Sequence, residues 1–219
     1  MRVGNFRCFV WDLDNTVIAS SRLLLGAFGE VGKKYLGKNL TPEEIVAMYG
    51  PPEGVVIEKM VGKERKSEAL RDFYRFYLEN HDHLVELFPG VVDILRYLKS
   101  KKVSNALFTS KGRRSAKITL EKLKLDPFFD LVVCGDEVPR AKPAPDGLNL
   151  LMERGDFTPE EVVFVGDSVL DWEAAQKAKV AFVFAGWDSF YRDRISSLDV
   201  LRVFYSPEEF LNWVRELYS

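Results

Sequence analysis

The chain has 219 residues, of which 47% are hydrophobic and 29% are charged, and its formal net charge is -2. This composition is that of a globular protein, and the length fits one large domain or a domain of typical size with a smaller insertion. The near-balance of charge argues against a nucleic-acid or anionic-membrane partner, and two cysteines are too few for a disulfide framework.

The first residues contain neither the long apolar run nor the small-residue cleavage site of a signal peptide. The longest apolar stretch is also far shorter than a membrane span. We therefore expect a cytoplasmic protein, in which Cys8 and Cys134 are buried free thiols.

Short apolar runs alternate along most of the chain with segments of helical periodicity. We predict strands at residues 7–11, 103–108, 131–134, 162–165, 181–184 and 203–205. We predict helices at residues 90–100, 113–124, 146–154 and 170–178, and a last helix from Ser206 to about Leu217. This repetition predicts an α/β fold with a parallel sheet between two helical layers, the Rossmann-like three-layer arrangement.

Residues 18–87 interrupt the alternation, because they show helical spacing and no convincing strand. Apolar side chains recur there at steps of three to four, as in Leu24, Phe28, Val31 and Tyr35. Thr41 and Glu44, with a proline between them, form the pattern of a capping box at a helix start. We therefore predict an all-helical domain over 18–87, inserted into a larger core of residues 1–17 and 88–219.

Acidic residues gather where two of the predicted strands end. Asp12 and Asp14 follow the first strand, and Asp167 and Asp171 follow the fourth. Because ligands bind beyond the carboxyl ends of parallel strands, these carboxylates are expected at one edge of the sheet. Such a density of hard oxygen ligands suits Mg²⁺. Each pair alone is also compatible with a polar turn or with acidic residues stabilised at a helix N-terminus.

A lysine and a hydroxyl-bearing turn complete the set. Lys142 precedes Pro143, which restricts it to extended conformations, and its ammonium would offset repulsion among carboxylates and a phosphate. Thr109 and Ser110 lie at a strand-to-helix turn, where hydroxyl and N–H groups can hold a phosphate. Lys111 adds positive charge at the same helix start, a hint of a bound anion. Alone, Lys142 is more simply a solvated loop residue, but the coincidence of all these groups at strand ends favours one common site.

In this order, the groups resemble the motifs of the haloacid dehalogenase-like hydrolases, especially the branch of phosphoglycolate phosphatase and β-phosphoglucomutase. The matching residues are Asp12, Asp14 and Thr16 (Asp-x-Asp-x-Thr), Thr109, Lys142, and Gly166, Asp167 and Asp171 (Gly-Asp-x-x-x-Asp). The helical insertion is also typical of this branch, so the resemblance covers almost the whole chain. Asn15 stands where Gly is common, but Asn tolerates positive φ. Trp11 stands where Phe is usual, which is a packing variation.

The resemblance implies a Mg²⁺-dependent phosphatase that works through a phosphorylated aspartate. Asp12 would be the nucleophile, and Asp14 would serve as general acid and then as general base. Mg²⁺ would be held by Asp12, by the backbone carbonyl of Asp14 and by Asp167. Asp171 would orient either a water on the metal or Lys142.

The resemblance also implies how phosphate and substrate are bound. Thr109 and Lys142 would complete the catalytic set, and together with Ser110 and the backbone N–H of Leu13 they would hold the phosphate oxygens. The inserted helices would form a cap that closes over a small phosphorylated metabolite, with phosphoglycolate as a nominal example. We expect a monomer or a weak homodimer without nucleic-acid or membrane partners.

Other functions stay open. A β-phosphoglucomutase-like phosphotransferase would share the first half-reaction and return the phosphate to a sugar. A phospho-acceptor signalling domain uses similar groups, but in another order and in a shorter chain without the insertion. A dehalogenase would not need Asp14, and a catalytically idle scaffold would not need the intact motifs.

Overall fold

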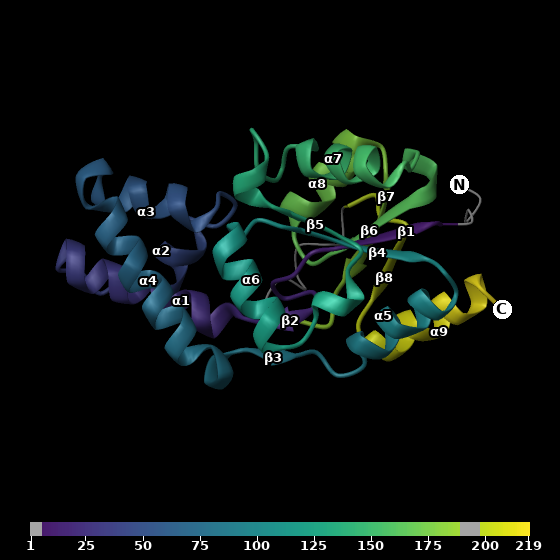
Figure 1. Cartoon of the computed structure of the whole chain (residues 1–219), viewed down its shortest axis with the longest axis horizontal. Coiled ribbons are helices and arrows are strands. Elements are labelled where there is room, and N and C mark those ends of the chain that lie inside the picture. The colour runs from purple at the N-terminus through teal and green to yellow at the C-terminus, as the bar shows by residue number, and fades with distance from the viewer. Residues whose placement is uncertain (1–5, 189–197) are drawn as a thin grey trace.

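The computed structural model describes residues 6–188 and 198–219. Within these ranges, six strands form a sheet in the order β5-β4-β1-β6-β7-β8, and every neighbouring pair is parallel (Figure 1). The strands are β1 (Cys8–Trp11), β4 (Ser104–Thr109), β5 (Leu131–Cys134), β6 (Val162–Gly166), β7 (Ala181–Ala185) and β8 (Arg202–Phe204). The predicted α/β fold and its six strands are confirmed.

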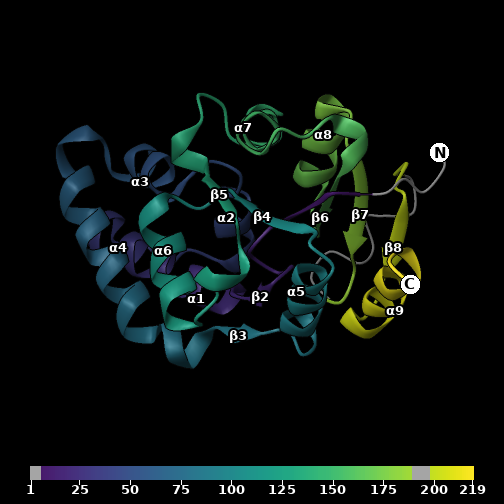
Figure 2. The same cartoon turned by 45° about the vertical axis from the view of Figure 1, so that its right-hand side comes forward.

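Helices cover both faces of this sheet (Figures 1 and 2). One layer contains α7 (Asp146–Gly155) and α8 (Val169–Ala178), and the other contains α5 (Val91–Ser100), α6 (Arg113–Lys122) and α9 (Pro207–Leu217). Short 3₁₀ turns span Asp126–Phe128, Gly135–Glu137 and Pro159–Glu161. In β1, Phe9 and Trp11 belong to the core under α5 and α9, whereas Cys8 and Val10 belong to the core under α7 and α8. Both faces of β1 are therefore buried, which explains its continuous apolar sequence.

Aromatic rings fill the layer between the sheet and α9. Phe210 of α9 is fully buried, and its ring lies 5.2–6.1 Å from the rings of Phe9, Trp11, Trp187, Phe204 and Trp213. All five contacts are edge-to-face, a favourable geometry for aromatic pairs. The C-terminal helix is thereby fixed against the central strand that leads into the acidic cluster.

The remaining helices gather at one end of the sheet (Figure 1). They are α1 (Ser21–Val31), a π-helical turn (Gly32–Leu36), α2 (Pro42–Val46), α3 (Glu53–Val61) and α4 (Lys63–Leu84). The long helix α4 packs against α1 and α3. The predicted capping box is confirmed, since the Thr41 hydroxyl accepts from the Glu44 N–H and the Glu44 carboxylate accepts from the Thr41 N–H.

Two short strands correct the prediction that residues 18–87 contain none. Strands β2 (Ile18–Ala19) and β3 (Glu86–Leu87) pair antiparallel at the two ends of the helical segment. Two residues are too few to show the alternation by which a strand is predicted from sequence. The pairing holds the entry and the exit of the helical segment side by side.

Two further features bear on the sequence predictions. Cys8 and Cys134 are free and buried, as predicted. In the described ranges, no helix combines the length and the apolar character needed to cross a membrane.

Replacing Phe210 by alanine tests the role of the aromatic layer. Loss of a fully buried phenyl ring is expected to lower the free energy of unfolding by about 3–5 kcal/mol. Urea denaturation measures this change. Leu78→Ala on α4 is the control, because Leu78 is 50% exposed and should change stability by no more than about 0.5 kcal/mol. Equal effects of the two substitutions would contradict this assignment of the core.

Candidate active site

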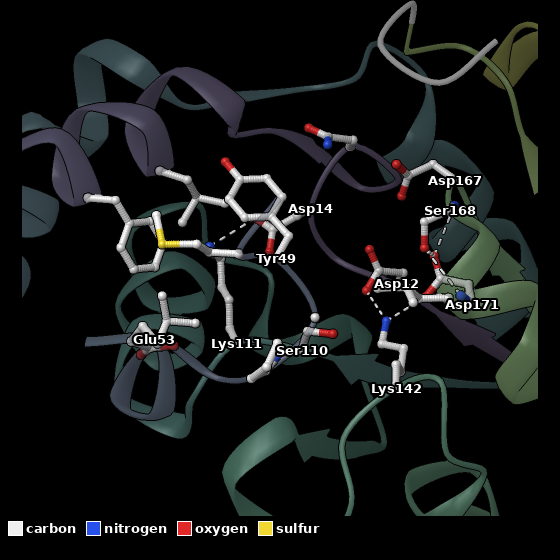
Figure 3. A pocket seen from close by; sticks show the side chains of 18 residues that line it. Asp12, Asp14, Tyr49, Glu53, Ser110, Lys111, Lys142, Asp167, Ser168 and Asp171 are labelled. Atoms are coloured by element: carbon white, nitrogen blue, oxygen red, sulfur yellow. Dashed lines mark hydrogen bonds and ion pairs between the residues drawn. The ribbon is translucent and has the colours of Figure 1, made fainter. Parts of the chain in front are cut away.

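The site is built around Asp12, the residue that follows β1. Its backbone N–H donates to the carbonyl of Val165 in β6 at 2.9 Å, so the carboxylate projects from the carboxyl end of the sheet. The ammonium of Lys142 lies 2.5 Å from Asp12 Oδ1 and 2.7 Å from Asp171 Oδ1 (Figure 3). All three side chains are buried. The structure thus brings Lys142 together with two carboxylates that are 130 and 29 positions away in the sequence.

Asp171 is fixed by the first turn of α8. Ser168 is the N-cap, and Asp171 Oδ2 accepts from its hydroxyl at 2.6 Å and from its N–H at 3.1 Å. One carboxylate oxygen therefore caps the helix, and the other pairs with Lys142. Gly166 allows the Asp171 side chain to lie against the end of β6, since a Cβ atom at position 166 would lie 2.7 Å from the Asp171 Cβ.

Asp167 follows β6 and completes a group of three buried carboxylates. Its Oδ1 accepts a hydrogen bond from the Thr16 hydroxyl at 3.0 Å. The Thr16 carbonyl in turn accepts from the indole N–H of Trp187 at 2.9 Å. One oxygen from each of Asp12, Asp167 and Asp171 lies within 4.8 Å of the others.

Crowding and burial shift the protonation of this group. Burial raises the pKa of Asp12 to about 7, Lys142 opposes the shift, and the nearby charges of Asp171 and Asp14 add to it. Burial, with repulsion from Asp171 and Asp12, also raises the pKa of Asp167 well above its ordinary value. Burial disfavours the charged form of Lys142, but attraction to Asp12 and Asp171 outweighs it and holds its pKa above the ordinary value.

The donor chemistry of the acidic group suits a divalent metal. Three carboxylates and one ammonium carry a formal net charge of -2 when all are ionised. Hard carboxylate oxygens are the ligands that Mg²⁺ prefers. A cation there would relieve the repulsion that adds to burial in raising the pKa of Asp12 and Asp167. Asp12, Asp167 and Asp171 could therefore hold such an ion.

The carboxylate of Asp14 points to different partners. Its Oδ1 accepts from the Ser20 hydroxyl and lies 3.0 Å from Lys111 Nζ. The intervening loop turns at Asn15, whose φ of 61° is in the left-handed region that asparagine tolerates. Asp14 thus faces the helical segment, while Asp12 faces the acidic group (Figure 3).

Thr109 and Ser110 lie at the end of β4, where the chain turns into α6. The buried Thr109 hydroxyl accepts from the Lys111 N–H at 3.2 Å. Ser110 lines the pocket beside Asp12, but neither Thr109 nor Leu13 is among the lining residues. The Lys111 ammonium is 5.0 Å from the ring centre of Tyr77 in α4.

Glu53 reaches this turn from the helical segment. It is the first residue of α3 and is buried, and its carboxylate accepts from Gly112 N–H at 2.7 Å, Ser115 Oγ at 2.8 Å and Tyr74 OH at 3.0 Å. Gly112 is the N-cap residue of α6, so an acidic side chain satisfies the start of that helix from outside the core.

These elements enclose a pocket of about 120 Å³ between the strand ends and the helical segment. Of the predicted site residues, Asp12, Asp14, Ser110, Lys142, Asp167 and Asp171 line it. Sequence reasoning assigned no role to Ser20, and none to Thr16 beyond its place in the first motif, and it did not foresee the contacts of Glu53 with the start of α6. The partners of Glu53 lie 21 to 62 positions away in sequence and left no local signal. Asp14, the partner of Ser20, is only six positions away, but no periodic pattern in the intervening loop predicts their contact.

Comparison with known proteins gives both a family match and similar individual proteins. The family model described as haloacid dehalogenase-like hydrolase matches residues 9–185. Pyrophosphatase PpaX from Bacillus cereus strain B4264 is 30% identical over 178 residues, which are 81% of this chain and 82% of that protein.

Solved structures share the fold. A predicted phosphoglycolate phosphatase from Haemophilus somnus 129PT is 23% identical with a TM-score of 0.83, covering 96% of this chain and 99% of that one. A proposed β-phosphoglucomutase from Thermotoga maritima is 28% identical with a TM-score of 0.69, covering 96% and 99% of the two chains.

The raised pKa values predict how stability depends on pH without metal. From about pH 4 to 7 the folded protein keeps a proton on Asp12 that the unfolded chain has lost, and the raised pKa of Asp167 acts in the same direction, so the free energy of unfolding falls as pH rises. The slope approaches roughly 1.4 kcal/mol per pH unit for each such proton. Asp167→Asn is expected to reduce this slope in urea denaturation with EDTA.

The control for this measurement is Asp93→Asn, which removes an exposed carboxylate of α5 that pairs with Arg96. It should leave the slope of the wild type unchanged. An Asp167→Asn protein that keeps the full slope would contradict the electrostatic description of the acidic group.

Proposed function

This chain belongs to the haloacid dehalogenase-like hydrolase family, and from that premise we propose that it is a Mg²⁺-dependent phosphatase acting through a phosphorylated Asp12. It is a phosphoric monoester hydrolase, and its substrate is a small phosphorylated metabolite. One observation carries the proposal. Asp12 is buried at the strand end, pairs with Lys142, and lies beside the two further carboxylates of Asp167 and Asp171.

Three groups would hold Mg²⁺ in this proposal: the carboxylates of Asp12 and Asp167 and the backbone carbonyl of Asp14. When bound, the ion would offset the negative charge of the phosphate and of the carboxylates around it. Asp171, through its 2.7 Å contact, orients the Lys142 ammonium. Thr16 orients Asp167 in the same way through its hydroxyl.

The reaction proceeds in two displacements at phosphorus. A carboxylate oxygen of Asp12 forms a bond to phosphorus as the ester bond breaks, and protonated Asp14 gives its proton to the departing oxygen. Asp14, now ionised, removes a proton from water. The water oxygen bonds to phosphorus, the bond to Asp12 breaks, and inorganic phosphate and free Asp12 result.

The surrounding residues position these steps. Lys142 holds Asp12 in place and balances charge on the transferring group. Ser20 and Lys111 keep the Asp14 side chain on the side where the leaving group would lie. Ser110 and Thr109, with the backbone N–H of Leu13, would bind the phosphate oxygens.

We propose that residues 18–87 act as a cap over a core of residues 1–17 and 88–219. The pairing of β2 with β3 supports this division, because it holds side by side the two segments where the chain enters and leaves the helical region. The contact of Glu53 with Gly112 closes the cap onto α6 beside the pocket. Closure would exclude bulk water during phosphoryl transfer.

The similar proteins are named for two kinds of reaction: some are named as phosphatases or pyrophosphatases, and one as a β-phosphoglucomutase. A phosphoglucomutase-type enzyme would use the same first displacement and then return phosphate to a sugar. The two reactions separate in one assay, since only the phosphatase releases inorganic phosphate in proportion to ester consumed.

Phosphate release from p-nitrophenyl phosphate tests the proposal. Wild type is expected to turn over with Mg²⁺ and not with EDTA, and Asp12→Asn to lower kcat/KM at least roughly 10³-fold, because the nucleophile is lost. Asp93→Asn is the control and should retain full activity. Phosphate release that is unchanged by Asp12→Asn or by EDTA would contradict the proposal.

A further inference from the structure

We infer that the leaving group of the substrate is uncharged and largely apolar, so that the site takes simple alkyl or aryl phosphomonoesters and discriminates against esters with a second anionic group. The inference rests on the proposed phosphatase function and concerns the part of the pocket away from Asp12. It distinguishes this site from one built for pyrophosphate or for a phosphorylated carboxylic acid.

The pocket has two chemically different ends (Figure 3). Asp12, Lys142 and Asp167 lie at one end, where the phosphoryl group would react. Glu53 lies toward the other end, with Lys111 and Tyr49 between the two ends (Figure 3). A leaving group attached to the phosphate would therefore extend toward the cap.

The cap contributes an apolar surface, here called the cap wall. It consists of Leu24, Phe28, Met48, Tyr49, Pro51 and Val56. Among the described residues that line the pocket, no lysine, arginine or histidine comes from residues 18–87. A carboxylate or second phosphate at the cap wall would thus be removed from water without a cationic partner from the cap, which is unfavourable.

The two lysines that line the pocket are already paired with carboxylates. Lys142 contacts Asp12 and Asp171, and Lys111 lies 3.0 Å from Asp14. These lysines share the lining with five carboxylates, those of Asp12, Asp14, Glu53, Asp167 and Asp171. When all are ionised, the lining has three more negative than positive charges. One bound Mg²⁺ would leave a single negative charge before any substrate arrives.

Glu53 occupies the position where a substrate anion could otherwise bind. The N–H of Gly112, the N-cap residue of α6, donates to its carboxylate at 2.7 Å, and two hydroxyl groups complete its hydrogen bonds. The start of this helix, a favourable place for an anion, is therefore filled by the protein itself. Fixed there, the Glu53 charge repels an anionic leaving group.

The arginines at the start of α6 do not add positive charge to the lining of the pocket. Arg113 pairs with Glu137 and its backbone N–H donates to Asp136, and the Arg114 guanidinium lies 4.3 Å from the ring centre of Tyr74. Neither arginine is among the residues that line the pocket.

A neighbouring cleft is also lined mainly by apolar residues. It has a volume of about 480 Å³ and shares Pro51 and Lys142 with the pocket. Its other lining residues include Pro52, Val55, Val138 and Pro139, and Asp136 is its one further charged side chain among the described residues. A longer leaving group would meet more apolar surface there and no additional cation.

Matched esters test this inference. 4-Methylphenyl phosphate and 4-carboxyphenyl phosphate differ chiefly in one charged group, and n-propyl phosphate and phosphoglycolate form an alkyl pair. We expect kcat/KM with Mg²⁺ to be at least about tenfold higher for the neutral ester of each pair, with inorganic pyrophosphate a poor substrate. Equal or better turnover of the charged esters or of pyrophosphate would overturn the inference.

A substitution in the cap wall tests whether its lack of a cation causes the preference for uncharged leaving groups. Met48→Lys introduces an ammonium on an unbranched side chain of similar length, and Met48→Leu is the matched uncharged variant. We expect Met48→Lys to shift the ratio of kcat/KM for 4-carboxyphenyl over 4-methylphenyl phosphate at least about tenfold toward the charged ester, and Met48→Leu to keep the wild-type ratio. An unchanged ratio in a Met48→Lys protein that still hydrolyses 4-methylphenyl phosphate would overturn the inference.

The Asp12→Asn protein separates this inference from the function on which it rests. Release of phosphate that depends on Asp12 and favours charged esters would contradict only the inference about the leaving group. The absence of Asp12-dependent release from every ester would contradict the phosphatase proposal as well.

Discussion

The burial of three carboxylates beside one lysine is the constraint on which this structure depends. Asp12, Asp167 and Asp171 place oxygens within 4.8 Å of one another, and Lys142 bridges two of them. Such a group is unfavourable without compensation, because burial and like charges both oppose ionisation. The parallel sheet, the capping box of α8 and the close approach at Gly166 hold the carboxylates there despite that cost. A site that retains uncompensated negative charge is suited to a divalent cation and to the anion that the cation attracts.

In the proposed function, the core and the cap have different tasks. The core would supply the groups that react with phosphorus, which any phosphomonoester presents in the same form. The cap would supply the surface that meets the leaving group, and that surface is apolar apart from Glu53 and the Tyr49 hydroxyl. The relative from Bacillus cereus is named a pyrophosphatase, yet similarity of the core does not determine what the cap accepts.

The sequence predicted the parts of the structure that depend on local pattern. Buried strands were visible as continuous apolar runs, and the Thr41 capping box was visible from its spacing. Strands β2 and β3 escaped prediction because pairing, not composition, defines a two-residue strand. The contacts of Glu53 with Gly112 and of Lys111 with Asp14 also escaped, since each joins segments far apart in the chain. The acidic residues of the candidate site were predictable from their place at strand ends, whereas the apolar character of the cap wall emerged only from the fold.

The central claim is that Asp12 carries the phosphoryl group, and direct detection of that group tests it most directly. An Asp14→Asn protein should be phosphorylated by an aryl phosphate, whose leaving group departs without a proton, and should then lose the phosphate slowly because no base activates water. Acid quenching, proteolysis and mass spectrometry locate the modification. The account predicts one phosphoryl group on the peptide that contains Asp12, and none when Asp12→Asn is added. Phosphate on another residue, or turnover without any phosphorylated peptide, would contradict it.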